Sequence, residues 1–128
     1  MIHRGSCLCG AVAYEIEGPM RPSVACHCSQ CRKTSGHYWS ATSVDVGRLT
    51  LIREAGLRWY RSSETAERGF CQHCGSSLFW REFGDEHVSI GAGTLDPPTG
   101  LRTARHIFVR DKSDYYEIED GPEQAPQA

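Results

Sequence analysis

Seven cysteines, gathered in three short clusters, are the residues of this sequence best suited to chemistry. The clusters are Cys7-Leu8-Cys9, Cys26-His27-Cys28-Ser29-Gln30-Cys31 and Cys71-Gln72-His73-Cys74. Two cysteines at positions i and i+2 of a strand project from the same face, and a Cys-x-x-Cys turn lets two sulfurs converge on one ion. Gly10 and Gly75 follow two of the clusters and allow the tight turns that a metal knuckle requires. The spacing therefore predicts zinc binding.

Two other interpretations of the cysteines fit less well. Buried free cysteines behave as small hydrophobes, but packing alone gives them no reason to form three tight clusters. A thioredoxin-type Cys-x-x-Cys begins a helix after a parallel strand, and the sequence indicates no such context. Seven is also an odd number, which argues against a fully paired disulfide scaffold and favours metal binding in a reducing compartment.

Seven thiolates divide most simply into a set of four and a set of three. A zinc ion enclosed by four thiolates is structural, whereas three protein ligands leave a position for substrate. One division pairs Cys28/Cys31 with Cys71/Cys74, as in an ordinary zinc ribbon. The other places Cys26, Cys28 and Cys31 on one ion and leaves Cys7 and Cys9 to meet Cys71 and Cys74. The second is favoured because three cysteines within six residues close on one ion with little loss of loop entropy.

Three segments have the order and spacing of a known family: Gly5–Gly10, Cys26–Lys33 and Arg68–Ser76. Together with Leu95-Asp96-Pro97 and His106-Ile107-Phe108-Val109, they resemble the glutathione-dependent formaldehyde-activating enzyme (GFA), or CENP-V/GFA domain, family. The resemblance runs from Gly5 to Tyr116, and all seven ligand positions are filled. The sequence departs from the family pattern after Lys112, where Tyr115 stands in place of the aromatic residue of an expected Pro-Trp pair.

The resemblance implies an Mss4-like β fold with two zinc ions per chain. It assigns a structural zinc to Cys7, Cys9, Cys71 and Cys74, and a second, catalytic zinc to Cys26, Cys28 and Cys31. It also implies a carbon–sulfur lyase that joins glutathione and formaldehyde into S-hydroxymethylglutathione, or cleaves that adduct. A thiol entering the open zinc position would ionise near neutral pH and become the nucleophile.

The sequence indicates the residues that contact the substrate less clearly than it indicates the metal ligands. Arg32 and Lys33 directly follow the three-cysteine set, where cations could attract a carboxylate-bearing thiol, although a solvated surface pair is equally compatible. His27 lies between two ligand cysteines on a strand and should face away from the metal. A competing hypothesis is a non-catalytic zinc module that binds a protein partner, with both metals structural; a zinc carrier is a third.

The elements that must position these residues are short strands. Val12, Tyr14 and Ile16 alternate with Glu15 and Glu17, and further strand signals cover residues 23–28, 38–46, 49–52, 57–61, 78–81, 87–90 and 106–110. Helix signals cover only residues 29–34 and 64–68. Because the crossover helices of a parallel sheet are missing, the pattern predicts a mainly β, antiparallel domain.

The chain of 128 residues fits one domain, expected over residues 1–119 and followed by a disordered tail over residues 120–128 that offers little apolar surface to bury. Fourteen basic and sixteen acidic residues give a net charge of −2, which argues against binding nucleic acid through its phosphates. No run approaches the roughly 18 apolar residues of a membrane span. We therefore expect a cytoplasmic protein whose partners are a small thiol and an aldehyde.

Overall fold

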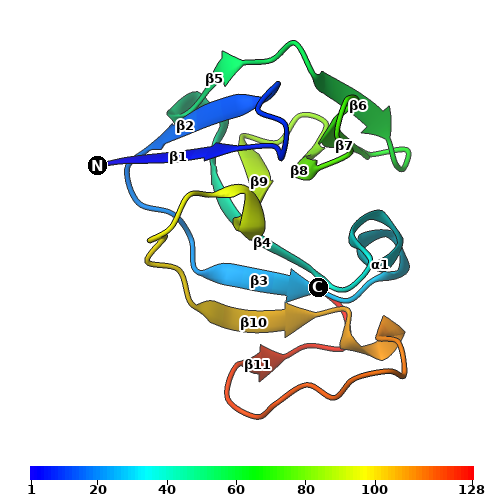
Figure 1. Cartoon of the computed structure of the whole chain (residues 1–128). Helices are drawn as coiled ribbons and strands as arrows, with labels where there is room; N and C mark the ends of the chain where they lie inside the picture. The colour runs from blue at the N-terminus through cyan, green and yellow to red at the C-terminus, as the bar shows by residue number, and fades with distance from the viewer.

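The computed structural model describes residues 1–128 and is mainly β (Figure 1). Its strands are β1 (Ile2–Ser6), β2 (Ala13–Glu17), β3 (Ser23–Cys26), β4 (Trp39–Asp45), β5 (Leu49–Arg53), β6 (Leu57–Arg61), β7 (Ala66–Cys71), β8 (Ser77–Glu82), β9 (His87–Gly91), β10 (Thr103–Ile107) and β11 (Glu123–Gln124). One α-helix, α1 (Ser29–Ser35), and three short 3₁₀ helices, η1 (Val46–Arg48), η2 (Ala92–Thr94) and η3 (Val109–Asp111), complete the fold. The predicted fold class is confirmed.

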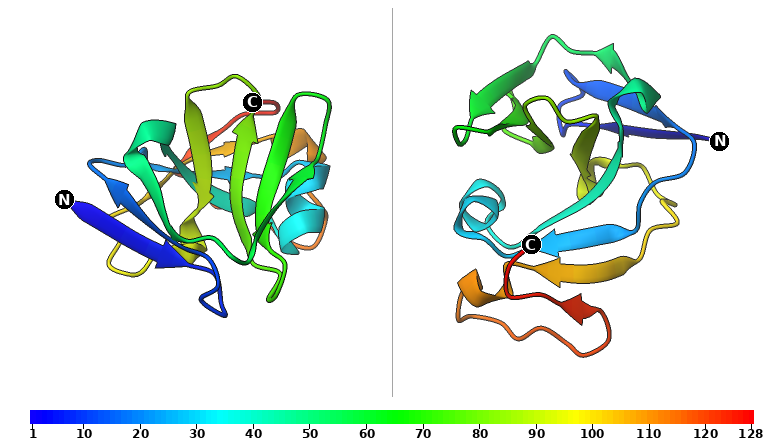
Figure 2. Two further views of the ribbon diagram at one scale, coloured as in Figure 1. Left: turned by 90° about the horizontal axis from the view of Figure 1, so that it is seen from above. Right: turned by 180° about the vertical axis from the view of Figure 1, so that it is seen from behind.

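The strands form two sheets, one of three strands in the order β1-β2-β5 and one of eight in the order β11-β10-β3-β4-β9-β8-β7-β6. Most neighbours are antiparallel, as predicted, but β10 pairs in parallel with both β3 and β11. A parallel pair requires a long connection, and here the strands between β3 and β10 supply it in place of a crossover helix. The large sheet curves, and α1 lies between its β6–β8 end and its β3–β10 end, as Figure 1 and the right-hand view of Figure 2 show.

The hydrophobic core takes its largest side chains from the two sheets. Tyr14 and Ile16 of β2 are fully buried, as their alternation with glutamates predicts, and they pack with Leu78, Phe79 and Ile90 of the large sheet. The rings of Tyr14 and Phe79 meet edge to face with their centroids 5.4 Å apart. This core also encloses two of the cysteines, Cys7 and Cys71.

One of the two predicted helices is correct and the other is wrong. Residues 29–34 lie in α1, which ends at Gly36 in the left-handed conformation, at a φ of 87°. Residues 64–68, predicted as a helical turn, instead lead into β7, which pairs with β6 on one side and β8 on the other. The charged residues of this segment resemble a solvated helical turn, but the two neighbouring strands satisfy its backbone. Tertiary pairing has overridden the local signal.

The segment over residues 120–128, for which the sequence predicts disorder, runs beside β10 in the structure. It contributes β11, and the Ala125 N–H donates to the His106 carbonyl (2.8 Å) while the Phe108 N–H donates to the Gln127 carbonyl (3.0 Å). Its composition offers little to bury, so main-chain pairing at the edge of β10 holds the segment. Composition alone does not reveal such pairing.

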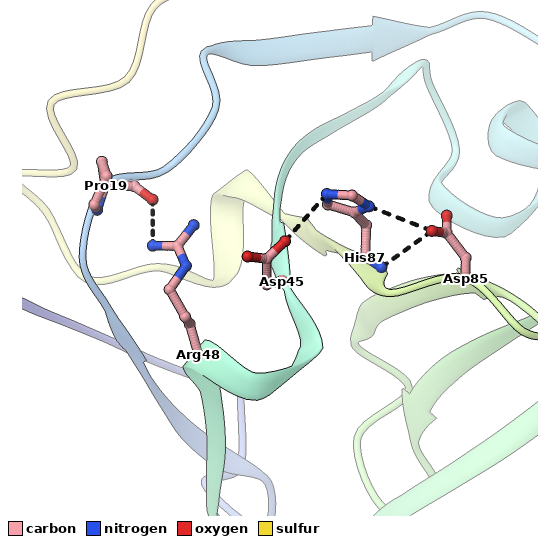
Figure 3. A network of polar contacts seen from close by, with 5 residues as sticks. All are labelled: Pro19, Asp45, Arg48, Asp85 and His87. Atoms are coloured by element: carbon pink, nitrogen blue, oxygen red, sulfur yellow. Dashed lines mark hydrogen bonds and ion pairs between the residues drawn. The ribbon is translucent and has the colours of Figure 1, made fainter.

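Polar contacts at the surface tie the turns together (Figure 3). Arg48 Nη1 donates to the Pro19 carbonyl at 2.6 Å. The His87 ring lies between two carboxylates, with Nε2 3.1 Å from Asp45 Oδ1 and Nδ1 3.3 Å from Asp85 Oδ1. These contacts hold the end of β4 against the start of β9. No helix in the structure combines the length and apolar character that crossing a bilayer needs.

Candidate metal centres and the adjoining cavity

The structure divides the seven cysteines into a group of four and a group of three. The first group is Cys7, Cys9, Cys71 and Cys74, whose Sγ atoms all lie within 4.8 Å of one another. Sγ of Cys9 is 3.7 Å from Sγ of both Cys7 and Cys71. Four thiolates around zinc at about 2.3 Å would have their sulfurs about 3.8 Å apart, so this donor set fits a tetrahedral ion.

Two tight turns present these four sulfurs. Cys7 directly follows β1 and Cys71 ends β7, so each knuckle begins where a strand ends. Gly10 and Gly75 close the turns with φ angles of 83° and 80°, a conformation that glycine adopts without strain. The Leu8 N–H donates to Ser76 Oγ at 3.0 Å and thereby joins one knuckle to the other.

The electrostatics of the four-cysteine group favour a bound cation. Burial opposes ionisation of Cys7, but the Val12 N–H, 3.2 Å from its Sγ, and the neighbouring thiols lower its pKa overall. Contact with Ser76 lowers the pKa of Cys74 to about 5. At Cys9 the backbone N–H of Ala11 favours the thiolate, yet desolvation and the neighbouring thiols raise the pKa to about 11. A positive charge among these sulfurs would stabilise the thiolates.

The second group consists of Cys26, Cys28 and Cys31, whose Sγ atoms also lie within 4.8 Å of one another. Cys26 ends β3, Cys28 is the N-cap of α1, and Cys31 lies in its first turn. The Cys31 N–H donates to Cys28 Sγ at 3.4 Å. Contacts with the other two thiols lower the pKa of Cys28, and the same kind of contact raises that of Cys26. Three sulfurs so placed can hold a metal ion with one position left over.

A cavity of about 570 Å³ adjoins the three-cysteine group. All three of its cysteines line this cavity, whereas none of the other four does. The other lining residues lie on strands of the large sheet, on α1, in adjoining loops and at the C-terminus. The large apolar and the charged ones among them are Trp39, Trp80, Ile107, Phe108, Arg21, Arg68 and Glu82. Such an apolar cleft with few polar groups is typical of a small-molecule site.

The charged residues at this cavity differ from the two that the sequence indicates. Arg32 and Lys33 lie on α1, Lys33 is exposed, and neither lines the cavity. Arg21 and Arg68 line it instead. Arg68 begins one of the three family segments, but the sequence does not indicate its place at the cavity because residues 64–68 resemble a helical turn. The alternation of a strand would have placed Arg68 and Phe70 on one face of β7.

His27 points away from the three sulfurs, as predicted, and is fully buried. Its Nε2 lies 2.9 Å from Nδ1 of His106, and its Nδ1 forms a hydrogen bond with the Tyr116 hydroxyl. Burial, reinforced by His106, lowers the pKa of His27 to about 4, so the ring is neutral at pH 7. Both ring nitrogens are engaged away from the cysteines, which gives His27 a packing role. The sequence gives no signal for the two partners, which are 79 and 89 residues away.

Comparison with known proteins matches residues 2–111 to the family model described as glutathione-dependent formaldehyde-activating enzyme. A protein of Halomonas elongata named for that enzyme is 32% identical over 133 residues, which cover 93% of this chain and 82% of the relative. A Schizosaccharomyces pombe protein named as a lyase, without a stated substrate, is 28% identical over 91% of this chain and 85% of its own.

The fold also has a solved counterpart. The crystal structure of a Rhodobacter sphaeroides protein superposes with a TM-score of 0.64 at 26% identity, covering 76% of this chain and 91% of that one. The family model spans nearly the whole chain, including both cysteine groups. The chain therefore belongs to the glutathione-dependent formaldehyde-activating enzyme family.

Proposed function

We propose that this protein is a zinc-dependent carbon–sulfur lyase that joins glutathione and formaldehyde into S-hydroxymethylglutathione, or cleaves that adduct. One observation carries the proposal: the three-cysteine group lines a cavity of about 570 Å³, while the four-cysteine group lies outside it. A thiol and an aldehyde can therefore reach one group without disturbing the other. The names of the relatives in Halomonas and Schizosaccharomyces support an enzyme of this kind.

The residues of the chain supply binding and orientation. Zinc held by Cys26, Cys28 and Cys31 would provide an open coordination position and let a bound thiol ionise near neutral pH. Trp39 and Trp80 wall the cavity with apolar surface and limit the water around the reacting atoms. In the forward direction the thiol sulfur bonds to the carbonyl carbon, the carbonyl electron pair moves to oxygen, and the proton lost by the thiol ends on that oxygen. Holding both reactants in one cavity contributes proximity.

Exchange spectroscopy by NMR tests the proposal directly. Glutathione and ¹³C-formaldehyde are mixed with zinc-loaded protein, and the exchange between free and thiol-bound formaldehyde is measured. We expect the protein to accelerate this exchange and Cys28→Ser to abolish the acceleration. Glu54→Gln, an exposed change in the turn between β5 and β6, should leave it intact. A zinc-loaded protein that gives no acceleration would overturn the proposal and favour the non-catalytic zinc module.

A further inference from the structure

Arg68 is a cation in direct contact with the three-cysteine group. From β7 it reaches across to α1, where its Nη2 lies 3.6 Å from Cys31 Sγ and 3.4 Å from Gln30 Oε1. Its guanidinium also lies over the Trp39 ring, 5.8 Å from the centroid. Arg68 lines the large cavity and also a smaller one of about 230 Å³ beside it. A ligand bound in the large cavity therefore has this guanidinium and the three sulfurs along the same lining.

The hydrogen-bonding capacity of Arg68 is largely unused within the chain. A guanidinium has five N–H donors, yet both contacts of Arg68 are made by Nη2, and its buried Nε has no partner. No carboxylate pairs with it, whereas Arg4, Arg81 and Arg105 each have an acidic partner. The only negative group beside Arg68 within the chain is the Cys31 sulfur, which Nη2 contacts, so Nη1 and Nε are left without a partner.

Resting on the proposed function, we propose that Arg68 binds a carboxylate of the thiol substrate and so positions its sulfur at the three-cysteine group. The planar guanidinium matches a carboxylate with two parallel N–H···O bonds, and its stacking on Trp39 fixes the plane of that fork. The preferred substrates are then thiols that carry a carboxylate, and small neutral thiols bind poorly. Arg68 acts as a specificity-determining residue.

Arg32 is the rival for this role. Its Nε is likewise buried without a partner, and Arg32 directly follows Cys31 in the sequence. Arg32 lies outside the cavity lining, however, and its charge acts on Tyr116, where it opposes the rise in pKa that burial causes. A carboxylate bound at Arg32 would lie away from the cavity that reaches the sulfurs. Substitutions of Arg68 and of Arg32 should therefore have different effects on the binding of a carboxylate-bearing thiol.

A matched pair of thiols tests the assignment without relying on catalysis. 3-Mercaptopropionate and 3-mercaptopropanol have similar size and differ in a carboxylate against a hydroxymethyl group. Binding of each to the zinc-loaded protein is measured by isothermal titration calorimetry, together with zinc content. We expect the wild type to prefer the carboxylate by about tenfold, the size of effect typical of a hydrogen bond to a charged group. Arg68→Gln should reduce this ratio to about one, while Arg58→Gln, an exposed change on β6, should keep it.

Each outcome decides for or against Arg68. A ratio that survives Arg68→Gln, or that disappears in Arg32→Gln instead, overturns the assignment. If Arg68→Gln loses zinc, Arg68→Lys is used, because it retains the charge but not the fork: a severalfold smaller ratio supports the proposal and an unchanged ratio overturns it. Failure of the proposed function would look different, since carboxylate preference would persist in a protein that does not accelerate formaldehyde exchange.

Discussion

Cys71 and Cys28, one from each group, differ in how much of the fold surrounds them. Cys71 is fully buried within the core between the sheets, whereas Cys28 is half-buried where β3 passes into α1. Cys71→Ser should therefore lower the melting temperature of the whole domain, because a structural zinc contributes folding free energy directly. Cys28→Ser should lose one zinc and remain folded. Thermal unfolding with zinc analysis measures both, and equal destabilisation by the two changes would contradict the division of roles.

Tyr14 provides a test of the core that involves no metal. Its ring is 1% exposed, its hydroxyl lies 2.6 Å from Thr94 Oγ1, and burial raises its pKa to about 12 from 10. The unfolded chain loses this proton first, so the stabilising effect is complete below pH 10 and is lost as pH rises toward 12. Two pKa units correspond to about 3 kcal/mol. Urea unfolding should show that the free energy of unfolding falls between pH 8 and pH 11, and that this fall is smaller in Tyr14→Phe than in the wild type. An identical fall in both proteins would exclude Tyr14 as its source.

The strands and the helix show where sequence reasoning succeeds. The period-two alternation around Tyr14 and the helix signal over residues 29–34 are local signals, and β2 and α1 form where those signals lie. Residues 64–68 carry a local signal of the wrong kind, and only their pairing with β6 and β8 makes them strand. The same error is the reason that the sequence does not predict the place of Arg68 at the cavity. The spacing of the cysteines thus indicates the two cysteine groups. The side of the cavity that carries Arg68 depends on contacts between elements that are distant in the sequence.

The C-terminal segment gives a prediction for one edge of the large sheet. The Phe108 and Val109 N–H groups donate to the carbonyls of Gln127 and Ala125. Deleting residues 120–128 should therefore speed hydrogen exchange at these two amides, because solvent replaces their acceptors. The amide of Val88, within β9, should be unaffected because that strand lies between β4 and β8. Residue-resolved exchange by NMR measures this, and unchanged rates at residues 108 and 109 would show that the pairing does not persist in solution.

The whole chain has little net charge, so long-range attraction does not bring an anionic thiol to it. Binding must depend on the few charges that face the cavity, Arg21, Arg68 and Glu82, and net charge alone could not have indicated them. These three charged residues line one cavity because the large sheet curves and brings β7 and β3 to either side of α1 (Figure 2). The order in which the strands pair decides which of them are neighbours, and no single segment of the sequence encodes that order.

The same arrangement predicts an order of metal loss. The three-cysteine group faces a cavity that a chelator can enter, and three thiolates enclose an ion less completely than four. The four-cysteine group joins β1 to the turn between β7 and β8, and two of its members lie in the main core. Titrating the zinc-loaded protein with a chelator should release one equivalent while circular dichroism stays native. Loss of the second equivalent should coincide with unfolding, because metal binding and folding are coupled there. If both ions were released in one step, or if the protein unfolded when the first ion was lost, both cysteine groups would be needed for the fold. The assignment of the three-cysteine group as catalytic and the four-cysteine group as structural would then fail.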